Sequence, residues 1–329
     1  MTRVTRLITA AVLGALVLGG CSGENGGGQA SASASSTGGQ AGTDGGTYAV
    51  ITHGAPGDPF WDVVKNGAEG AGKRYGAAVT YQGDGDPAKQ AQLIDQAVSQ
   101  KVDGLVVSMA NPDALRESVT KAVAAKIPVI TINSGGDSSK EFGAITHVGQ
   151  SEEVAGRGAG EKLKAEGVTK LLCVIHEAGN VGLDQRCNGA TATLGGTVER
   201  LQVDVSNLAD ATSKIKARLQ ADTSVNGVLT LNPAIAVAAR EAIADGRSKA
   251  KLATFDLSAD VVDSIQIGQI LFAVDQQQYL QGWLPITFLY LYKNNLNIVG
   301  GGLPVNTGPG FVTKDNAAQV AELALEGTR

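Results

Sequence analysis

The stretch DGLVVSMANPDALRESVTKAVAAKIPVITIN, residues 103–133, decides the fold class. Its two ends, 103–108 and 127–133, are short apolar runs rich in Val and Ile, a pattern that predicts buried strands. Between them, residues 112–125 place apolar side chains at helical spacing. A strand, a helix and a second strand in this order form a parallel βαβ unit, so the chain is predicted to be an α/β protein.

The same alternation extends outward from this unit, beginning at Thr47. It predicts further strands at 48–52, 77–81, 169–175, 197–203, 225–231, 251–255 and 270–274, and helices at 59–75, 87–101, 152–166, 180–194, 208–221, 233–244, 258–267 and 279–294. AITHVGQSEEVAG (144–156) separates two runs of such units and is interpreted as a crossover between two sheets. We therefore expect two Rossmann-like, doubly wound parallel-sheet domains.

The first 46 residues are predicted to lie outside these domains. Residues 1–20 carry Arg3 and Arg6 before an apolar run too short to span a bilayer, as in an export signal. Leu18-Gly19-Gly20-Cys21 resembles a bacterial lipobox, which makes Cys21 the lipidated first residue of the mature chain; an ordinary signal peptide that contains a cysteine is the alternative. Residues 21–46 include nine Gly and five Ser after Cys21 and predict a flexible tether.

Charge and motifs exclude several classes of function. With 27 Lys+Arg against 32 Asp+Glu in 329 residues, the formal charge of −5 gives no basic footprint for nucleic acid. The sequence has no GxxxxGK[ST], GxSxG or HExxH motif, and GRGAG (156–160) is interpreted as small residues for helix packing. With three His in all, we expect no metal, no cofactor and no enzymatic activity.

Polar side chains follow most of the predicted strands. Ligands of doubly wound sheets bind outside the carboxyl ends of the strands, so these positions are candidates for a binding site. Turn chemistry alone also favours polar residues there and is the alternative at each position. These strand-end residues are His53 and Asp58 after the first strand, then Ser108, Asn133, Ser134, His176, Glu177, Asn232, Asp256, Asp275 and Gln276.

Taken together, the segments resemble the type I periplasmic sugar-binding proteins, of the ribose-binding type, that serve ABC importers. The resemblance rests on the lipobox, PFW (59–61), VDGLVVS (102–108), AAKIPVITINS (124–134), LNPAIAVAAREAI (231–243), and LATFD (252–256) followed by FAVDQQ (272–277). It implies three crossovers, near 148–152, 275–279 and 303–308. One lobe is then 47–149 plus 278–305, and the other is 150–277 plus 306–329.

The resemblance also implies ligand-binding residues. Asp58, Phe60 and Trp61 match the position of an Asn followed by paired aromatic residues, and Asn232, Asp256 and Gln276 match hydroxyl-binding positions. This chain departs from the family at Ser108, at Asn133-Ser134, which replace an Asp-Arg pair, and at Asp184, which replaces an Arg and has Arg186 nearby. His53, Glu177 and Asn180 are further candidates. Core packing of Phe60 and Trp61, and helix capping by Asp256, are the structural alternatives.

These residue types favour a small neutral sugar or polyol. Carboxylates accept hydrogen bonds from hydroxyl groups, whereas a carboxylate ligand would need a free Arg fork, for which only Arg186 is a candidate. We expect a monomeric, lipid-anchored receptor on the extracytoplasmic face of the cell membrane that delivers its ligand to an ABC permease and its ATPase. A sensor coupled to a membrane kinase or chemoreceptor, and a glycoside hydrolase, are the alternatives.

Cys173 and Cys187 are the remaining cysteines, 14 positions apart. In an exported chain they are predicted to form a disulfide between strand 169–175 and the following helix, with two buried free thiols as the alternative.

Overall fold

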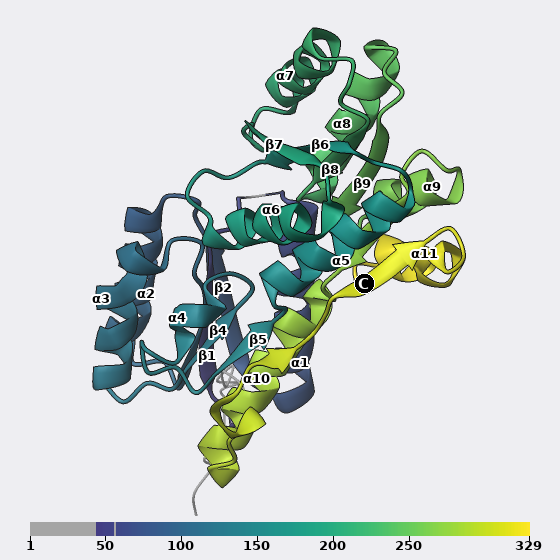
Figure 1. Cartoon of the computed structure of the whole chain (residues 1–329). Helices are drawn as coiled ribbons and strands as arrows, with labels where there is room; N and C mark the ends of the chain where they lie inside the picture. Colours follow the sequence, from purple (N-terminus) through teal and green to yellow (C-terminus); the bar gives the residue numbers. More distant parts are fainter. Residues whose placement is uncertain (1–43, 56) are drawn as a thin grey trace, which may run out of the picture. The chain divides into compact units, whose positions relative to one another are not determined.

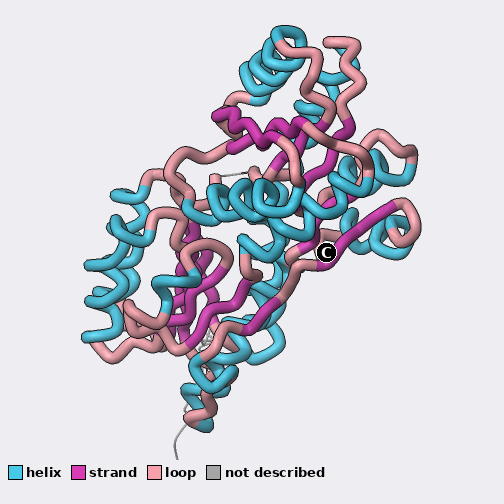
Figure 2. Tube along the Cα trace, in the orientation of Figure 1, coloured by secondary structure: helices cyan, strands magenta, loops and turns pink. Residues whose placement is uncertain are grey.

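The computed structural model describes residues 44–55 and 57–329, so the predicted signal, Cys21 and nearly all of the tether lie outside the described residues. Two six-stranded sheets organise these residues, each with helices on both faces (Figures 1 and 2). The predicted α/β class with two doubly wound, largely parallel sheets is confirmed.

The first sheet and its helices are called the N-lobe. Its strand order is β11-β5-β4-β3-β1-β2, and its strand pairs are parallel, for example with Val50 beside Val106. Its elements are β1 (Thr47–Thr52), α1 (Pro59–Tyr75), β2 (Ala78–Gly83), α2 (Pro87–Ser99), β3 (Gly104–Ser108), α3 (Pro112–Ala124), β4 (Val129–Ile132), α4 (Gly136–Ser139), β5 (Thr146–Gly149), α10 (Gln278–Asn295), the 3₁₀ turn Gly300–Gly302 and β11 (Val305–Asn306).

The second sheet and its helices are called the C-lobe. Its strand order is β12-β10-β9-β8-β6-β7, and β12 alone is antiparallel to its neighbour, β10. Its elements are α5 (Glu152–Ala165), β6 (Lys170–Ile175), α6 (Val181–Leu194), β7 (Thr197–Gln202), α7 (Leu208–Ala221), β8 (Gly227–Thr230), α8 (Pro233–Asp245), β9 (Lys251–Phe255), α9 (Ala259–Gln266), β10 (Phe272–Asp275), β12 (Gly310–Thr313) and α11 (Ala317–Leu325).

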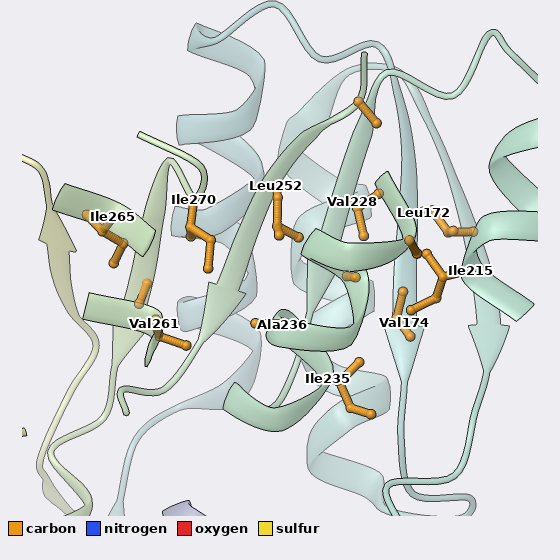
Figure 3. Packing of buried hydrophobic residues seen from close by; sticks show 14 of the residues in the cluster. Leu172, Val174, Ile215, Val228, Ile235, Ala236, Leu252, Val261, Ile265 and Ile270 are labelled. Atoms are coloured by element: carbon orange, nitrogen blue, oxygen red, sulfur yellow. The ribbon is translucent and has the colours of Figure 1, made fainter. Parts of the chain in front are cut away.

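Successive side chains of a strand point to opposite faces of the sheet, and this produces two apolar layers in each lobe. In β1, Tyr48 and Val50 pack toward α1 and α10, whereas Ile51 packs toward α2 and α3. In β6, Leu172 and Val174 face the helices α7, α8 and α9, a cluster drawn in Figure 3. Strands covered on both faces read as continuous apolar runs, which is why the sequence revealed them.

The chain passes between the two sheets three times, after β5, after β10 and after β11. The segment 144–156, interpreted as a crossover, contains the first of these passages and also contributes β5, in which Thr146 pairs with Ile130 of β4. Only Gln150 and Ser151 connect β5 to α5. A four-residue strand with a single strongly apolar residue, Val148, has too little periodicity to be recognised in the sequence.

Small residues bring α5 and α6 into close contact. A Cβ atom built on Gly156 would lie 2.2 Å from the Arg186 carbonyl oxygen, and one on Gly189 would lie 2.2 Å from that of Glu153. Both glycines are therefore required by the approach of the helices. This packing explains GRGAG (156–160), and it places the start of α5 beside the first turns of α6 (Figure 1).

Candidate functional site

A cavity of about 540 Å³ lies where the carboxyl ends of strands from both lobes meet. Most of the residues predicted to bind a ligand line this cavity: His53, Asp58, Phe60, Trp61, Asn133, Ser134, Glu177, Asn180, Arg186, Asn232, Asp256 and Gln276. Its volume lies in the range of sites for small molecules.

Two aromatic rings at the start of α1 form one apolar part of the wall. Phe60 and Trp61 are buried, with their ring centroids 4.9 Å apart in an edge-to-face arrangement. Trp61 also meets the His53 ring edge to face at 4.7 Å. Both aromatic residues belong to the N-lobe core as well as to the cavity, so the packing and binding interpretations are compatible.

Helix-capping side chains connect the two lobes across the cavity. Asp58 caps α1, because its Oδ1 accepts a hydrogen bond from the Phe60 N–H at 3.0 Å, and its Oδ2 accepts one from Asn232 Nδ2 at 3.1 Å. Asn232 in turn caps α8 with Oδ1. Each residue thus binds its own helix with one atom and the other lobe with the second.

A second contact between the lobes forms at the start of α6. Asn180 caps this helix, donates from Nδ2 to Glu177 Oε2 at 2.8 Å, and accepts from Ser134 Oγ at 3.0 Å. Its Nδ2 also lies 3.4 Å from His53 Nε2. Ser134 and His53 belong to the N-lobe, so four side chains that the sequence suggested separately meet here.

Amide groups join the lobes beside this point. Asn133 Nδ2 donates to Gln276 Oε1 at 3.1 Å, and Gln276 Nε2 donates to Asp256 Oδ1 at 2.7 Å. Asn133 and Asp256 both have positive φ, of 59° and 68°. Asn and Asp tolerate this left-handed conformation better than most residues, which accounts for their presence directly after β4 and β9.

The C-lobe side of the cavity contains a buried charge cluster. Arg186 donates from Nε and Nη2 to the two carboxylate oxygens of Glu152, at 2.6 and 3.0 Å. Its Nη1 lies 3.6 Å from Asp256 Oδ2 and donates to the Leu231 carbonyl oxygen at 3.2 Å. The guanidinium carbon lies 4.5 Å from the centroid of the Phe255 ring. Arg186 is therefore fully engaged within the C-lobe.

Burial shifts the protonation equilibria of the cavity. It raises the pKa of Asp256 to about 7, although Arg186 and Gln276 oppose the shift, and that of Asp58 to about 6, although the bonds from Phe60 and Asn232 oppose it. Burial also lowers the pKa of His53, against the effect of Glu177. It lowers the pKa of His176 to about 3, with Arg186 and His53 contributing. Both imidazoles are therefore neutral at pH 7.

Two predicted ligand-binding residues do not line the cavity. Asp184 points away on α6, half exposed, where it accepts a hydrogen bond from Arg200 at 2.7 Å; replacement of the family Arg by Asp fits this surface position. Ser108 is fully buried behind the wall, where its Oγ lies 2.7 Å from His53 Nδ1 and accepts from the His53 backbone N–H. Ser108 therefore orients His53 and has no access to a ligand.

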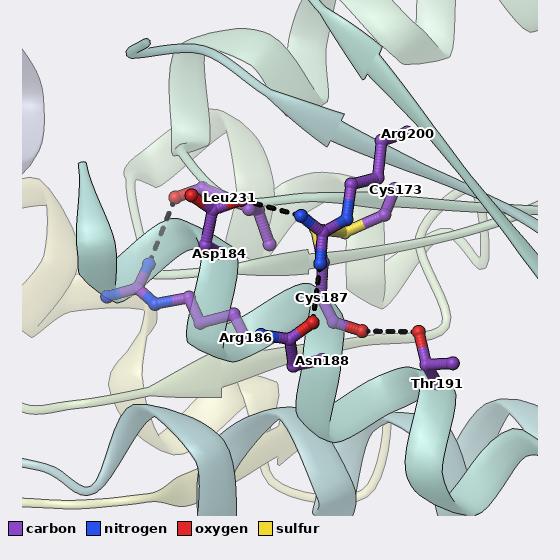
Figure 4. The surroundings of a disulfide bond; sticks show 8 residues. All are labelled: Cys173, Asp184, Arg186, Cys187, Asn188, Thr191, Arg200 and Leu231. Atoms are coloured by element: carbon purple, nitrogen blue, oxygen red, sulfur yellow. Dashed lines mark hydrogen bonds and ion pairs between the residues drawn. A yellow bond between two sulfur atoms is a disulfide. The ribbon is translucent and has the colours of Figure 1, made fainter. Parts of the chain in front are cut away.

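Cys173 and Cys187 form the predicted disulfide, with 6.1 Å between their Cα atoms. It joins β6 to α6, where Cys187 directly follows Arg186 (Figure 4). Both cysteines are fully buried in the layer between the C-lobe sheet and the helices α5 and α6. The bridge therefore fastens the helix that carries Arg186 to the sheet.

The cavity also includes residues that were not predicted to bind a ligand. Asp204 and Ser206 follow β7, so extending the strand-end rule to this strand would have found them. Lys214 comes from α7 and is paired with Asp210 at 2.9 Å, and no sequence signal marked it. His176, a strand-end residue left out of the predicted site, also contributes to the wall.

Among residues 44–55 and 57–329, no cluster of His, Cys, Asp and Glu is arranged to hold a metal ion. Within the same residues, none of the helices combines the length and apolar character that crossing a bilayer requires.

Known proteins resemble this chain along most of its length. The family model of the periplasmic binding protein domain matches residues 48–296. A carbohydrate transporter from Acidothermus cellulolyticus, solved in complex with myo-inositol, is 43% identical; the match covers 86% of this chain and 99% of that chain, with a TM-score of 0.85.

Two sequence relatives are more distant. The ribose import binding protein RbsB of Bacillus subtilis is 26% identical over 69% of this chain and 75% of its own length. The xylose/arabinose-binding protein XylF of Sulfolobus acidocaldarius is 25% identical over 68% of this chain, and the match spans 60% of the length of XylF.

Proposed function

This chain belongs to the periplasmic binding protein family, and from that premise we propose that it captures a small neutral sugar or polyol between its lobes. The resemblance to the type I periplasmic sugar-binding proteins of ABC importers is confirmed. Relatives in this family bind sugars for transport, in agreement with the expected absence of enzymatic activity.

The composition of the cavity wall supports a neutral ligand. Its two basic side chains, Arg186 and Lys214, already pair with Glu152 and Asp210. Aromatic rings, amides and carboxylates make up much of the remaining wall, including Phe60, Trp61, Asn133, Glu177, Asn180, Asn232 and Asp256. Such a wall offers an apolar surface for a ring and acceptors for its hydroxyl groups.

Myo-inositol is the first ligand to test, because the solved relative with 43% identity was crystallised with it. Calorimetric titrations of the purified chain with myo-inositol, D-ribose, D-xylose and L-arabinose should give saturable binding with one of them at a stoichiometry of one. Sugar binding at an unchanged affinity in an Asn232→Ala, Asp256→Ala double variant would place the site elsewhere. Absence of binding to every neutral sugar and polyol in a broad thermal-shift screen would reject the function itself.

Closure of the lobes on the ligand is the proposed signal to the importer. A ligand favours the closed form only through contacts with both lobes, and Asp58 and Asn232, which line the cavity from different lobes, lie within hydrogen-bond distance of each other. We infer that residues 47–149 with 278–305 and residues 150–277 with 306–329 move as two bodies about the three crossings. The ligand-bound chain, acting as a monomer, would then dock on an ABC permease and its ATPase.

We also propose that Cys21 carries a lipid that holds the protein at the extracytoplasmic face of the cell membrane. The support is the lipobox-like Leu18-Gly19-Gly20-Cys21 and the Gly- and Ser-rich segment that follows. In cells fed radiolabelled palmitate, the full chain should become labelled and sediment with membranes, whereas the Cys21→Ala variant should do neither. Equal labelling of both proteins would refute the anchor.

A further inference from the structure

Glu152 is a buried carboxylate that contacts a cavity residue without lining the cavity itself. It is the first residue of α5, and its side chain is 3% exposed. Gln150 Nε2 donates to its Oε2 at 2.9 Å, and the close packing of α5 on α6 fixes its position relative to Arg186. The carboxylate–guanidinium pair is therefore held in place by contacts within the chain itself.

Arg186 has the chemistry to bind an anionic sugar. Its guanidinium lies at the cavity wall, and a guanidinium is the side chain best suited to two-point binding of a carboxylate. In this structure, however, that two-point contact is made by Glu152, through Nε and Nη2. Burial alone lowers the pKa of Arg186, but Glu152 and Asp256 outweigh burial and raise it, so Arg186 remains charged and compensated.

We propose that Glu152 is a specificity-determining residue, which makes the cavity exclude sugar acids by occupying the carboxylate-binding edge of Arg186. A uronate entering the cavity would meet the carboxylates of Asp58, Glu177 and Asp256 without a free cation to offset them. Its own carboxylate would lose hydration and gain no charge-assisted partner. A neutral sugar or polyol has no such charge to bury.

This inference rests on the proposed function and predicts an effect on selectivity rather than on binding alone. Glu152→Gln keeps the shape of the side chain and removes its charge, so the positive charge of Arg186 loses its main partner and can be offset by an incoming carboxylate. The quantity to measure is the ratio of the dissociation constants for D-glucuronate and myo-inositol, or for D-glucuronate and the tightest neutral ligand of the screen. Because both constants come from the same protein sample, a partly inactive sample does not change their ratio.

For the wild type, calorimetry should give a dissociation constant for D-glucuronate that is at least 100-fold larger than the one for the neutral ligand. In Glu152→Gln the ratio should shift at least tenfold toward glucuronate, and the double variant Glu152→Gln, Arg186→Gln should abolish this shift. Glu153→Gln is the matched control, because Glu153 lies next to Glu152 on α5 but is exposed and pairs with Arg157. It should leave the ratio at the wild-type value.

Glu152→Gln leaves Arg186 with less compensation for its buried charge, so a second variant covers the case in which the first does not fold. Glu152→Asp keeps the charge but shortens its reach, and it should shift the ratio in the same direction by a smaller factor. An unchanged ratio in the folded variant, for instance because Asp256 replaces Glu152 as the partner of Arg186, overturns the inference. So does a wild type that binds glucuronate as tightly as the neutral ligand. A wild type that binds no carbohydrate refutes the proposed function instead.

Discussion

The two lobes share one architecture but contribute different chemistry to the cavity. The N-lobe supplies the aromatic rings of Phe60 and Trp61 together with neutral polar groups such as Asn133 and Ser134. The C-lobe supplies the Arg186 cluster and is stiffened by the disulfide behind it. Similar βα units therefore make different contributions to the cavity: the aromatic rings come from one lobe, and the paired guanidinium comes from the other.

Helix-capping residues also make contacts between the lobes. On each side, a residue that caps a helix also reaches across the cavity: Asp58 at α1, and Asn180 and Asn232 at α6 and α8. Capping is a local property of the sequence, and it holds each side chain in one orientation. The capping and binding interpretations of these strand-end residues are therefore two aspects of the same position.

The largest expected effect is on the stability of the C-lobe. Replacing both Cys173 and Cys187 by Ser removes a crosslink that closes a loop of about 15 residues, which should lower the free energy of unfolding by about 3 kcal/mol. Urea titrations should be followed by circular dichroism and by Trp fluorescence, since Trp61 and Trp283 both lie on N-lobe helices. The dichroism midpoint should fall further than the fluorescence midpoint. A variant as stable as the wild type contradicts the structural role of the bridge.

The next largest effect tests the aromatic wall of the N-lobe. Trp61→Ala should weaken binding of the neutral ligand by about 2 kcal/mol, roughly 30-fold, because buried Trp side chains at binding surfaces commonly contribute this much. Trp283→Ala is the control: Trp283 stacks on Tyr279 within α10 and does not line the cavity. Calorimetry that finds equal losses for the two variants, both folded by circular dichroism, would show that Trp61 acts through packing alone.

A smaller effect concerns the charge on the C-lobe side and its dependence on pH. The ionised carboxylate of Asp256 is the form that accepts hydrogen bonds from ligand hydroxyl groups, and its pKa is raised by burial to about 7. Affinity should therefore increase from pH 5.5 to pH 8, by up to about tenfold per pH unit below the pKa. Asp256→Asn should reduce this slope, leaving the weaker dependence from Asp58, whose pKa is about 6. A slope equal to that of the wild type would exclude Asp256 as its source.

The raised pKa values of Asp58 and Asp256 also determine how the stability of the protein changes with pH. The native state retains protons on Asp58 and Asp256 at a pH where the unfolded chain has released them. The stability that these two groups contribute is therefore complete below about pH 4 and is lost as the pH rises through about 6 and 7. Thermal unfolding of the ligand-free protein should show that Asp256→Asn flattens this part of the profile.

Much of the fold could be predicted because buried parallel strands leave continuous apolar runs. The bounds of α1 and β9 agree with those expected, whereas β5, β11 and β12 were missed. β11 has two residues, and β12 lies at the edge of its sheet, so neither shows a clear alternation of apolar and polar side chains.

Many site residues could be predicted because the carboxyl ends of parallel strands lie together at one edge of each sheet. The orientation of a helix face was not predictable in the same way: Asp184 and Arg186 are two residues apart on α6, yet one faces solvent and the other the cavity. Glu152 was not predicted because its partner, Arg186, is 34 positions away in the sequence. Its role depends on the packing of two helices, which strand-end reasoning does not address.

The smallest expected effect tests the corrected position of Asp184. Its ion pair with Arg200 is half exposed, and such pairs contribute at most about 1 kcal/mol to stability because water screens them. Asp184→Ala should leave the calorimetric dissociation constant of the neutral ligand within twofold of the wild-type value, because the side chain does not reach the cavity. The family match that implied a ligand contact at Asp184 makes the opposite prediction. A tenfold loss of affinity in a folded Asp184→Ala protein would mean that α6 turns on closure and presents a different face to the ligand.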